Sequence, residues 1–281
     1  MYRSFNWTRA SRFRNDLTRA YEPIQPLLLR SLAERSKCNV FIDVGANIGA
    51  YSLLMSEVQS IREIHAFEPA PDTFGELVRN VEMNGLGDKI TAHQKALSDS
   101  AESVRFGIVN RLSGANSILS TSIHSGFETE VEVQAARLDD CLSLQGERLC
   151  LKIDVEGHER RALAGMSSIL SDNSVLLQIE DYGNDAADLP AVLEQFGLRS
   201  LCRVGPDRYF TNSETLGDRD TVSAFEAASR GLVEEALADM REREGDGIRP
   251  IQINVGPSIS FVLKGAAARA ARRIRHPWRK R

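Results

Sequence analysis

Apolar residues follow two different periods along the chain from residue 39 onward. Short apolar runs that stop at glycine or proline are typical of buried strands, and a repeat every three to four residues is typical of helices. The predicted strands span residues 39–45, 63–69, 89–99, 149–157 and 174–182, and the predicted helices span residues 50–60, 72–85, 158–170 and 189–197. This alternation predicts an α/β fold in which helices cover both faces of a mostly parallel sheet.

Two segments depart from this alternation. Residues 102–109 and 128–138 have β patterns and enclose a polar Ser/Gly-rich stretch, which predicts a β-rich insertion between the third and fourth strands. Residues 199–212 are predicted to form a closing β-hairpin, which brings the main sheet to seven strands. Loops in such insertions often contact substrates, and the candidates for acceptor recognition in this one are Ser113, Asn116, Ser117 and His124.

The chain divides into three predicted regions. Residues 1–37 are predicted to form a helical N-terminal extension, residues 38–212 the α/β domain, and residues 213–281 a C-terminal extension. Residues 220–245 have the pattern of an amphipathic helix. Its predicted apolar face consists of Phe225, Ala228, Leu232, Ala236 and Met240.

Charge is unevenly distributed over these regions. The formal net charge is −4, but residues 264–281 carry +8 and residues 1–37 carry +5, which leaves −17 for residues 38–263. Such an acidic centre repels phosphate backbones, so we expect no nucleic-acid partner. The basic tail is interpreted either as a solvated end or as a weak peripheral contact with an anionic membrane surface.

The apolar runs, the N-terminus and the cysteines indicate the cellular compartment. No run approaches the roughly 18 apolar residues of a membrane span, and the Arg-rich N-terminus has no apolar core of the kind that secretory signals contain. The four cysteines are scattered without a C-x-x-C pair, which favours buried reduced thiols over a disulfide framework or a zinc site. The expected compartment is the cytoplasm. The sequence does not indicate the oligomeric state.

The turn after the first strand contains the most informative chemistry. Its pattern is Asp43-x-Gly45-x-x-x-Gly49, and Asn47 stands where dinucleotide-binding proteins have their middle glycine. Asp43 at the strand end would repel a phosphate, so the turn suits a ligand with an ammonium or sulfonium group. Glu68 ends the second strand, 19 residues after Gly49, where a carboxylate accepts hydrogen bonds from ribose hydroxyls. Adenosine with a cationic head describes S-adenosylmethionine; alternatively, the glycines only form a tight turn and Glu68 is a solvated strand end.

A third group of polar residues follows the fourth and fifth strands. Asp154, Glu156 and His158 follow the fourth strand, and Glu180 and Asp181 end the fifth. Ligands of open parallel sheets bind at the carboxyl ends of the strands, so these side chains are expected to face one crevice.

At this point the sequence resembles the FkbM-type S-adenosylmethionine-dependent methyltransferases. The resemblance rests on "DVGANIGAYS", "AFEPAPDTFGELVRNVEMNG" and "LKIDVEGHERRALAG" and covers about residues 38–183. It implies a Rossmann-like class I methyltransferase fold and, most often, O-methylation of a sugar, glycolipid or polyketide hydroxyl. The positions that match the family's cofactor loop, ribose-binding acid and following helix are Asp43, Gly45, Gly49, Glu68, Asn80 and Asn84.

Methyl transfer to a hydroxyl requires positioning of both reactants and a base that takes the hydroxyl proton. Asp154 is the first candidate for this base, followed by His158 and Glu180. Alternatively, Asp154, Glu180 and Asp181 hold a Mg²⁺ ion that polarises the hydroxyl. The competing functions are a cofactor-binding scaffold without catalysis and a nicotinamide-dependent oxidoreductase.

Overall fold

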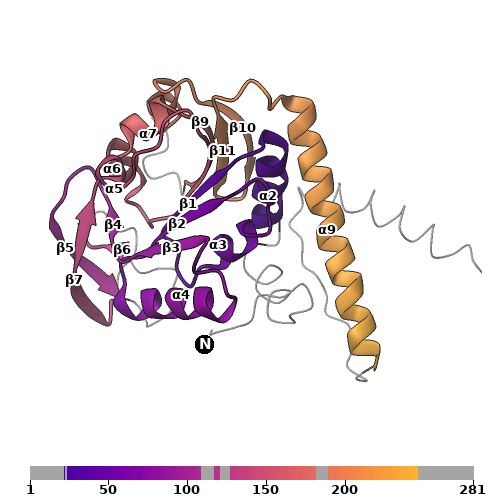
Figure 1. Ribbon diagram of the computed structural model, residues 1–281, viewed down its shortest axis with the longest axis horizontal. Helices are drawn as coiled ribbons and strands as arrows, with labels where there is room; N and C mark the ends of the chain where they lie inside the picture. The colour runs from indigo at the N-terminus through magenta and orange to yellow at the C-terminus, as the bar shows by residue number, and fades with distance from the viewer. Residues whose placement is uncertain (1–21, 23, 109–116, 121–126, 182–188, 246–281) are drawn as a thin grey trace, which may run out of the picture. The chain divides into compact units, whose positions relative to one another are not determined.

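A computed structural model describes residues 22, 24–108, 117–120, 127–181 and 189–245, with side chains up to residue 231 (Figure 1). The helices are α2 (Gln25–Ser36), α3 (Ala50–Met55), α4 (Pro71–Met83), α5 (Leu138–Cys141), α6 (Glu159–Ala164), α7 (Ser167–Ser171), α8 (Leu189–Glu194) and α9 (Asp218–Gly245). Three acceptor candidates, Ser113, Asn116 and His124, and the basic tail lie outside the described residues.

The main sheet has seven strands in the order β10-β11-β9-β8-β1-β2-β3. They are β1 (Val40–Val44), β2 (Glu63–Phe67), β3 (Ile90–His93), β8 (Arg148–Ile153), β9 (Ser174–Glu180), β10 (Arg199–Val204) and β11 (Asp207–Thr211). All neighbours pair in parallel except at β11, which is antiparallel to β9 and β10. The predicted mostly parallel, seven-stranded sheet is therefore confirmed.

The direction in which the chain adds strands reverses between β1 and β8. From β1 the chain adds β2 and β3 on one side, and it then returns to place β8 and β9 on the other. Such a switch point leaves a crevice at the carboxyl ends of the two strands, and ligands of α/β sheets bind there. The topology thus places any small-molecule site beside the ends of β1 and β8.

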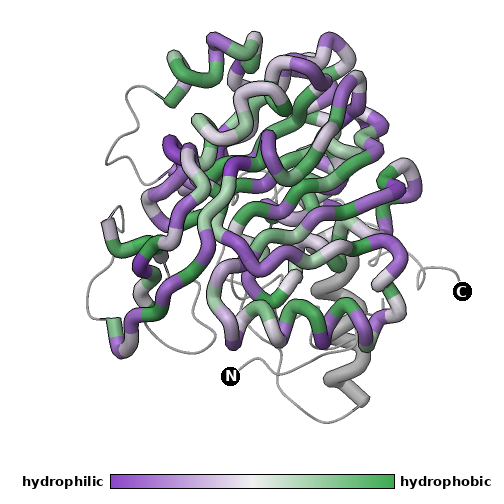
Figure 2. The backbone as a smooth tube through the Cα atoms, turned by 60° about the vertical axis from the view of Figure 1, so that its left-hand side comes forward, coloured by the Kyte–Doolittle hydropathy of each residue, from purple (hydrophilic) through white to green (hydrophobic). Residues whose placement is uncertain are grey.

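The two faces of the sheet have different partners. Alternate residues of β1, β8 and β9, among them Ile42, Leu151 and Leu177, join a fully buried apolar cluster with side chains of α6, α7 and α8. On the opposite face Asp43 contacts α3 through Ser52. Figure 2 shows hydrophobic positions concentrated along these central strands. The prediction that helices cover both faces is confirmed.

The insertion forms a second sheet in the order β4-β7-β5-β6, built from β4 (Ala96–Leu97), β5 (Ser103–Ile108), β6 (Ser117–Ile118) and β7 (Thr129–Ala136). Its apolar face packs around Phe106 and Val133 and against Ala70, two residues after Glu68. Ser117, a predicted acceptor contact, is buried in β6. The single strand predicted over residues 89–99 was wrong, because its first half belongs to the main sheet and its second half to this one.

A second error concerns the helix predicted over residues 158–170. The structure has two short helices, α6 and α7, separated at Gly165. A Cβ on Gly165 would lie 1.9 Å from the backbone oxygen of Ser98. The close approach of the segment after β4 therefore accounts for the glycine at this break.

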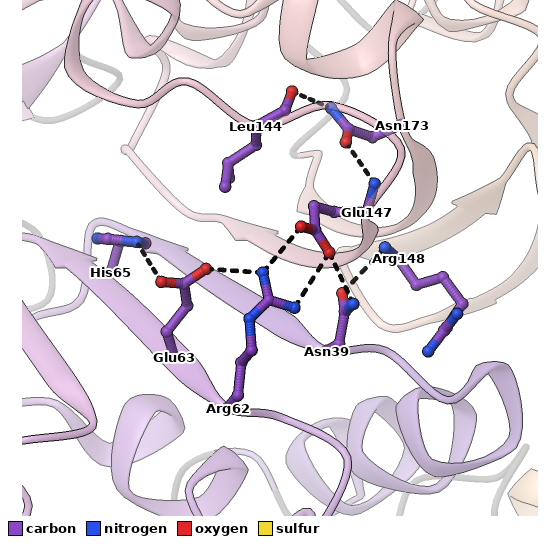
Figure 3. Close-up of polar contacts among 8 residues, drawn as sticks. All are labelled: Asn39, Arg62, Glu63, His65, Leu144, Glu147, Arg148 and Asn173. Atoms are coloured by element: carbon purple, nitrogen blue, oxygen red, sulfur yellow. Dashed lines mark hydrogen bonds and ion pairs between the residues drawn. The ribbon is translucent and has the colours of Figure 1, made fainter.

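Polar contacts join the amino ends of the parallel strands, on the side opposite the crevice (Figure 3). The Arg62 guanidinium donates to both carboxylate oxygens of Glu147, at 3.0 and 2.8 Å. Asn39, before β1, donates to Glu147 at 2.7 Å and accepts from the backbone N–H of Arg148 at 3.0 Å. These bonds fix the relative positions of β1, β2 and β8 at this edge.

Contacts divide the described residues into two compact units, residues 32–221 and residues 22–31 with 222–245. Within these residues no helix has the length and apolar character that crossing a membrane requires. All four cysteines are free thiols; Cys38 and Cys150 are buried as predicted, whereas Cys141 and Cys202 are only half-buried. The predicted domain boundaries at residues 37 and 212 remain a prediction.

Candidate active site

The turn after β1 requires its glycines. Gly45 has φ +79° and Gly49 has φ +86°, in the left-handed region where glycine carries no steric cost. A Cβ on Gly45 would lie 1.9 Å from the backbone oxygen of Asp154, and one on Gly49 would lie 2.5 Å from Leu77. Asn47 also has a left-handed conformation, with φ +50°. The turn therefore brings the end of β1 into direct contact with the end of β8.

Hydrogen bonds from the neighbouring elements hold the turn in place. The backbone N–H groups of Gly45 and Ala46 donate to the Phe67 carbonyl at 3.0 and 2.9 Å. From the last turn of α4, the buried Asn80 amide donates to the Ile48 carbonyl at 2.8 Å. The turn is thus anchored to both β2 and α4.

Glu68 lies against this turn and is almost completely buried. One carboxylate oxygen accepts from the Asn47 N–H at 3.0 Å, and the other accepts from the Ala70 N–H at 2.9 Å. Burial raises the pKa of Glu68 to about 7, although the two N–H donors act to lower it. A carboxylate has about four acceptor positions, so two remain for other donors. This arrangement fits the recognition of two ribose hydroxyls.

Asp43 is buried beneath the turn. Its Oδ2 accepts from the Ser52 N–H at 3.1 Å and from the Ser52 hydroxyl at 2.7 Å, which fixes the start of α3. Its Oδ1 has no hydrogen-bond partner among the described residues. Burial raises the pKa of Asp43, and the nearby Lys152 ammonium and the Ser52 donors partly offset this effect. Together with the Gly45 turn and Glu68, this acceptor fits an adenosine ligand with a cationic head.

The carboxylates at the carboxyl ends of β8 and β9 meet beside the turn. Asp154, Glu156 and Glu180 each place one oxygen within 4.8 Å of the others. The Lys152 ammonium lies 2.8 Å from Asp154 Oδ2. Burial acts to raise the pKa of Asp154, but Lys152 and a hydrogen bond with Glu180 outweigh it and hold this pKa below its ordinary value. A carboxylate that stays ionised at neutral pH can accept a proton or a hydrogen bond from a hydroxyl.

Asp181, the third residue of the Mg²⁺ alternative, does not join this cluster in the way expected, because its carboxylate pairs with Arg208 at 2.9 Å. Glu156 lies close to Asp154 and Glu180 instead. A divalent ion prefers such oxygen ligands. Since the chain itself supplies a cation in contact with Asp154, we assign no metal to these carboxylates.

The remaining predicted site residues make local contacts. His158 is buried, and its Nε2 lies 3.0 Å from the Ser98 hydroxyl. Burial lowers the pKa of His158 to about 4, so the ring is neutral at pH 7. Asn84 ends α4 and donates to the Asn80 carbonyl at 2.7 Å.

Three polar residues on the α3 side of the sheet were missed by sequence reasoning. They are Lys152 of β8, Gln178 of β9 and Tyr51 of α3. The Lys152 ammonium lies 4.7 Å from the centre of the Tyr51 ring, and the Gln178 amide donates to the Tyr51 hydroxyl at 3.0 Å. The available signal was the occurrence of a lysine and a glutamine inside otherwise apolar strands, because buried polar groups require partners.

Comparison with known proteins agrees with this geometry. The chain is 31% identical over 201 residues to methyltransferase sdnD of Sordaria araneosa, covering 60% of this chain and 78% of that protein. It is 27% identical to the 31-O-demethyl-FK506 methyltransferase FkbM of Streptomyces tacrolimicus (63% and 79%) and 28% identical to the hexuronic acid methyltransferase AglP of Haloferax volcanii (62% and 69%). Residues 43–200, more than half of the chain, match the Methyltransferase FkbM domain. This match confirms the predicted family and, with it, S-adenosylmethionine as the cofactor: the chain belongs to the FkbM methyltransferase family.

Proposed function

We propose that this protein is an O-methyltransferase that modifies a hydroxyl of a sugar, a glycolipid or a small natural product. The observation that carries the proposal is the contact between the glycine turn after β1 and Asp154 at the end of β8. The backbone of Asp154 lies so close to Gly45 that no Cβ fits between them. A base at Asp154 and a cofactor at the glycine turn would therefore be immediate neighbours.

S-adenosylmethionine supplies a methyl group bonded to a sulfonium, which is already an activated leaving group. We assign its binding to the turn that Gly45, Asn47 and Gly49 form, whose positive φ angles give the turn its shape. Glu68 has acceptor positions for the ribose, and Asp43 has a buried acceptor for a donor or cation. Asn84 remains a predicted cofactor contact of the family pattern.

The chain's own contribution to the chemistry is positioning and proton transfer. As the acceptor oxygen bonds to the methyl carbon, the bond from that carbon to the sulfonium sulfur would break and S-adenosylhomocysteine would leave, while the hydroxyl proton would move to a carboxylate oxygen of Asp154. Glu180 shares a hydrogen bond with Asp154 and orients it. We rank His158 below both, since its Nε2 is already in contact with Ser98. General-base assistance of this kind contributes roughly 10²- to 10⁴-fold.

The acceptor class is supported by the relatives and by charge. Two relatives are named for action on a natural product and on a hexuronic acid. The −17 charge of residues 38–263 disfavours a nucleic-acid acceptor. We keep the cytoplasm as the expected compartment because the cysteines are free thiols.

The test is methyl transfer from trideuteromethyl-labelled S-adenosylmethionine to a panel of sugars, glycolipids and polyketide alcohols, followed by mass spectrometry. One acceptor should gain a single labelled methyl group on oxygen. Asp154→Asn should lower turnover at least about 100-fold while cofactor affinity is retained. The matched control is Asp172→Asn, since Asp172 is exposed and its carboxylate accepts a hydrogen bond from the Gln145 amide at 3.3 Å.

The competing functions predict different results in the same experiment. A non-catalytic scaffold would bind the cofactor and label no acceptor. A nicotinamide-dependent oxidoreductase would bind NAD(H) and not S-adenosylhomocysteine. Normal turnover by Asp154→Asn would move the base to another residue.

A further inference from the structure

Lys152 is a lysine in the interior of a central parallel strand. Its side chain is 5% exposed, and β8 is paired on both sides, with Asp43 of β1 and Gln178 of β9 as its register neighbours. Burying an ammonium group is costly unless it is paired. A functional requirement is therefore a reasonable explanation for a lysine at this position.

The surroundings of Lys152 and Asp154 are strongly acidic. The carboxyl groups near the pair are Asp43 of β1, Glu68 after β2, Glu156 after β8, Glu159 of α6 and Glu180 of β9, and Asp207 of β11 accepts from the Gln178 amide beside Tyr51. All six are acids. Among the described residues named here, Lys152 supplies the positive charge, and its ammonium forms an ion pair with Asp154 at 2.8 Å.

Two further contacts fix where the ammonium lies. The face of the Tyr51 ring is 4.7 Å from Lys152 Nζ, a favourable cation–π distance. The Tyr51 hydroxyl accepts from the Gln178 amide at 3.0 Å, and the same amide donates to Asp207 at 2.7 Å. Lys152 is thus held between an aromatic ring and the carboxylate after its own strand.

We propose that Lys152 is a positioning residue for methyl transfer: its ammonium keeps Asp154 ionised and fixed beside Glu180, so that Asp154 receives the acceptor's hydroxyl proton. This inference rests on the proposed function. It assigns to the chain's own lysine the part that a divalent cation plays in metal-dependent sites. Lys152 does not touch the reacting atoms, since its contact with the reaction runs through Asp154.

The physical reason is the repulsion among the neighbouring carboxylates. Carboxylates that share a site cannot all ionise, and one of them retains a proton well above its ordinary range. With Lys152 present, its ammonium and the hydrogen bond with Glu180 hold the pKa of Asp154 below its ordinary value, so Asp154 is an ionised member of the group. Without Lys152, Asp154 and Glu180 compete for the proton, and the base is lost over part of the neutral pH range.

The main experiment compares the pH dependence of turnover for the wild type and for Lys152→Met. An opposite charge at this distance shifts a carboxyl pKa by about one to three units. In Lys152→Met the midpoint of the acidic limb of the kcat–pH profile should therefore move to higher pH by that amount. The variant should approach wild-type kcat at high pH, and at that pH it should bind S-adenosylhomocysteine within about threefold of the wild type. A purely structural defect would lower kcat equally at every pH, and that result, or an unmoved limb, would overturn the proposal.

Two variants serve as controls. Lys152→Arg retains the charge, and its acidic limb should stay with that of the wild type. Lys89→Met removes a lysine that lies before β3 and donates to the Ser56 carbonyl at 2.7 Å, and it should leave the profile unchanged. A limb shifted equally in Lys152→Arg and Lys152→Met would contradict the role of the charge.

A measurement on the wild type keeps the proposal testable if Lys152→Met does not fold or if no acceptor is methylated. Carbon-13 labelling of the aspartate carboxyl groups allows Asp154 to be titrated directly by NMR, with Asp154→Asn identifying its resonance. The Asp154 carboxyl should titrate below the ordinary pKa of an aspartic acid and should therefore remain ionised throughout the neutral pH range. A titration midpoint near or above 7 would refute the inference, whereas a failure to methylate any acceptor would refute only the proposed function.

Discussion

Gly45→Ala places a methyl group where two strands touch. The residue has φ +79°, and its Cβ would lie 1.9 Å from the Asp154 backbone oxygen. The left-handed conformation costs an alanine about 1–2 kcal/mol. The overlap forces the ends of β1 and β8 apart, and overpacking of this kind typically costs about 1–3 kcal/mol. We therefore expect a loss of roughly 2–5 kcal/mol in the free energy of unfolding.

Two other glycines separate these contributions. Gly85 has φ +63° with open space around its Cβ position, so Gly85→Ala carries the conformational cost alone. Gly75 lies within α4, also in open space and without a positive φ, so Gly75→Ala should stabilise the protein by about 0.5–1 kcal/mol. For a chain of this size each kcal/mol changes Tm by about 2–4 °C.

Thermal unfolding and titration with S-adenosylhomocysteine measure both consequences. Gly45→Ala should have the lowest Tm of the three, on the order of 10 °C below the wild type, and should bind the ligand at least about tenfold more weakly because the turn is displaced. Gly85→Ala and Gly75→Ala should bind like the wild type. A Gly45→Ala variant that has the same Tm as Gly85→Ala and binds S-adenosylhomocysteine with wild-type affinity would refute the close contact between β1 and β8.

Three further predictions concern residues around the turn and the opposite edge of the sheet. Burial raises the pKa of Glu68 from its ordinary 4.5 to about 7, so between these pH values the folded state binds a proton that the unfolded state has lost. The Tm of the wild type should therefore fall relative to that of Glu68→Gln as pH rises from about 4.5 to about 7. A difference in Tm that does not change with pH would contradict this. Asn80→Ala leaves the Ile48 carbonyl without its 2.8 Å donor and should cost about 1–3 kcal/mol in denaturant unfolding, together with weaker S-adenosylhomocysteine binding. A double-mutant cycle on Arg62 and Glu147, whose side chains are 49% and 24% exposed, should give a coupling of no more than about 1 kcal/mol that decreases with added salt; a larger, salt-independent value would argue against a solvated pair.

The fold and the cofactor turn were predictable because their signals are local. Asp43, Gly45 and Gly49 lie within seven positions of one another, and Glu68 ends the next strand along the chain. Strand and helix periods then define the sheet. Gly45 and Gly49 have positive φ angles, which explains why the sequence pattern has glycine at these two positions.

The environment of the proposed base depends on long-range pairing and was not predictable. Strand alternation alone cannot show that Lys152 lies between Asp43 and Gln178, because that arrangement requires the order β9-β8-β1 and its register. The contact of His158 with Ser98 joins residues 60 positions apart. It forms because the strand predicted over residues 89–99 divides between two sheets, which no local pattern indicated.

Isothermal titration of the full chain with S-adenosylhomocysteine tests the central assignment most directly. We predict saturable binding at one site per chain, and a loss of at least about tenfold in affinity for Glu68→Ala, whose carboxylate lies against the Asn47 N–H at 3.0 Å. No heat of binding at high micromolar ligand, or equal affinity of the wild type and Glu68→Ala, would contradict the assignment of the cofactor to the turn after β1.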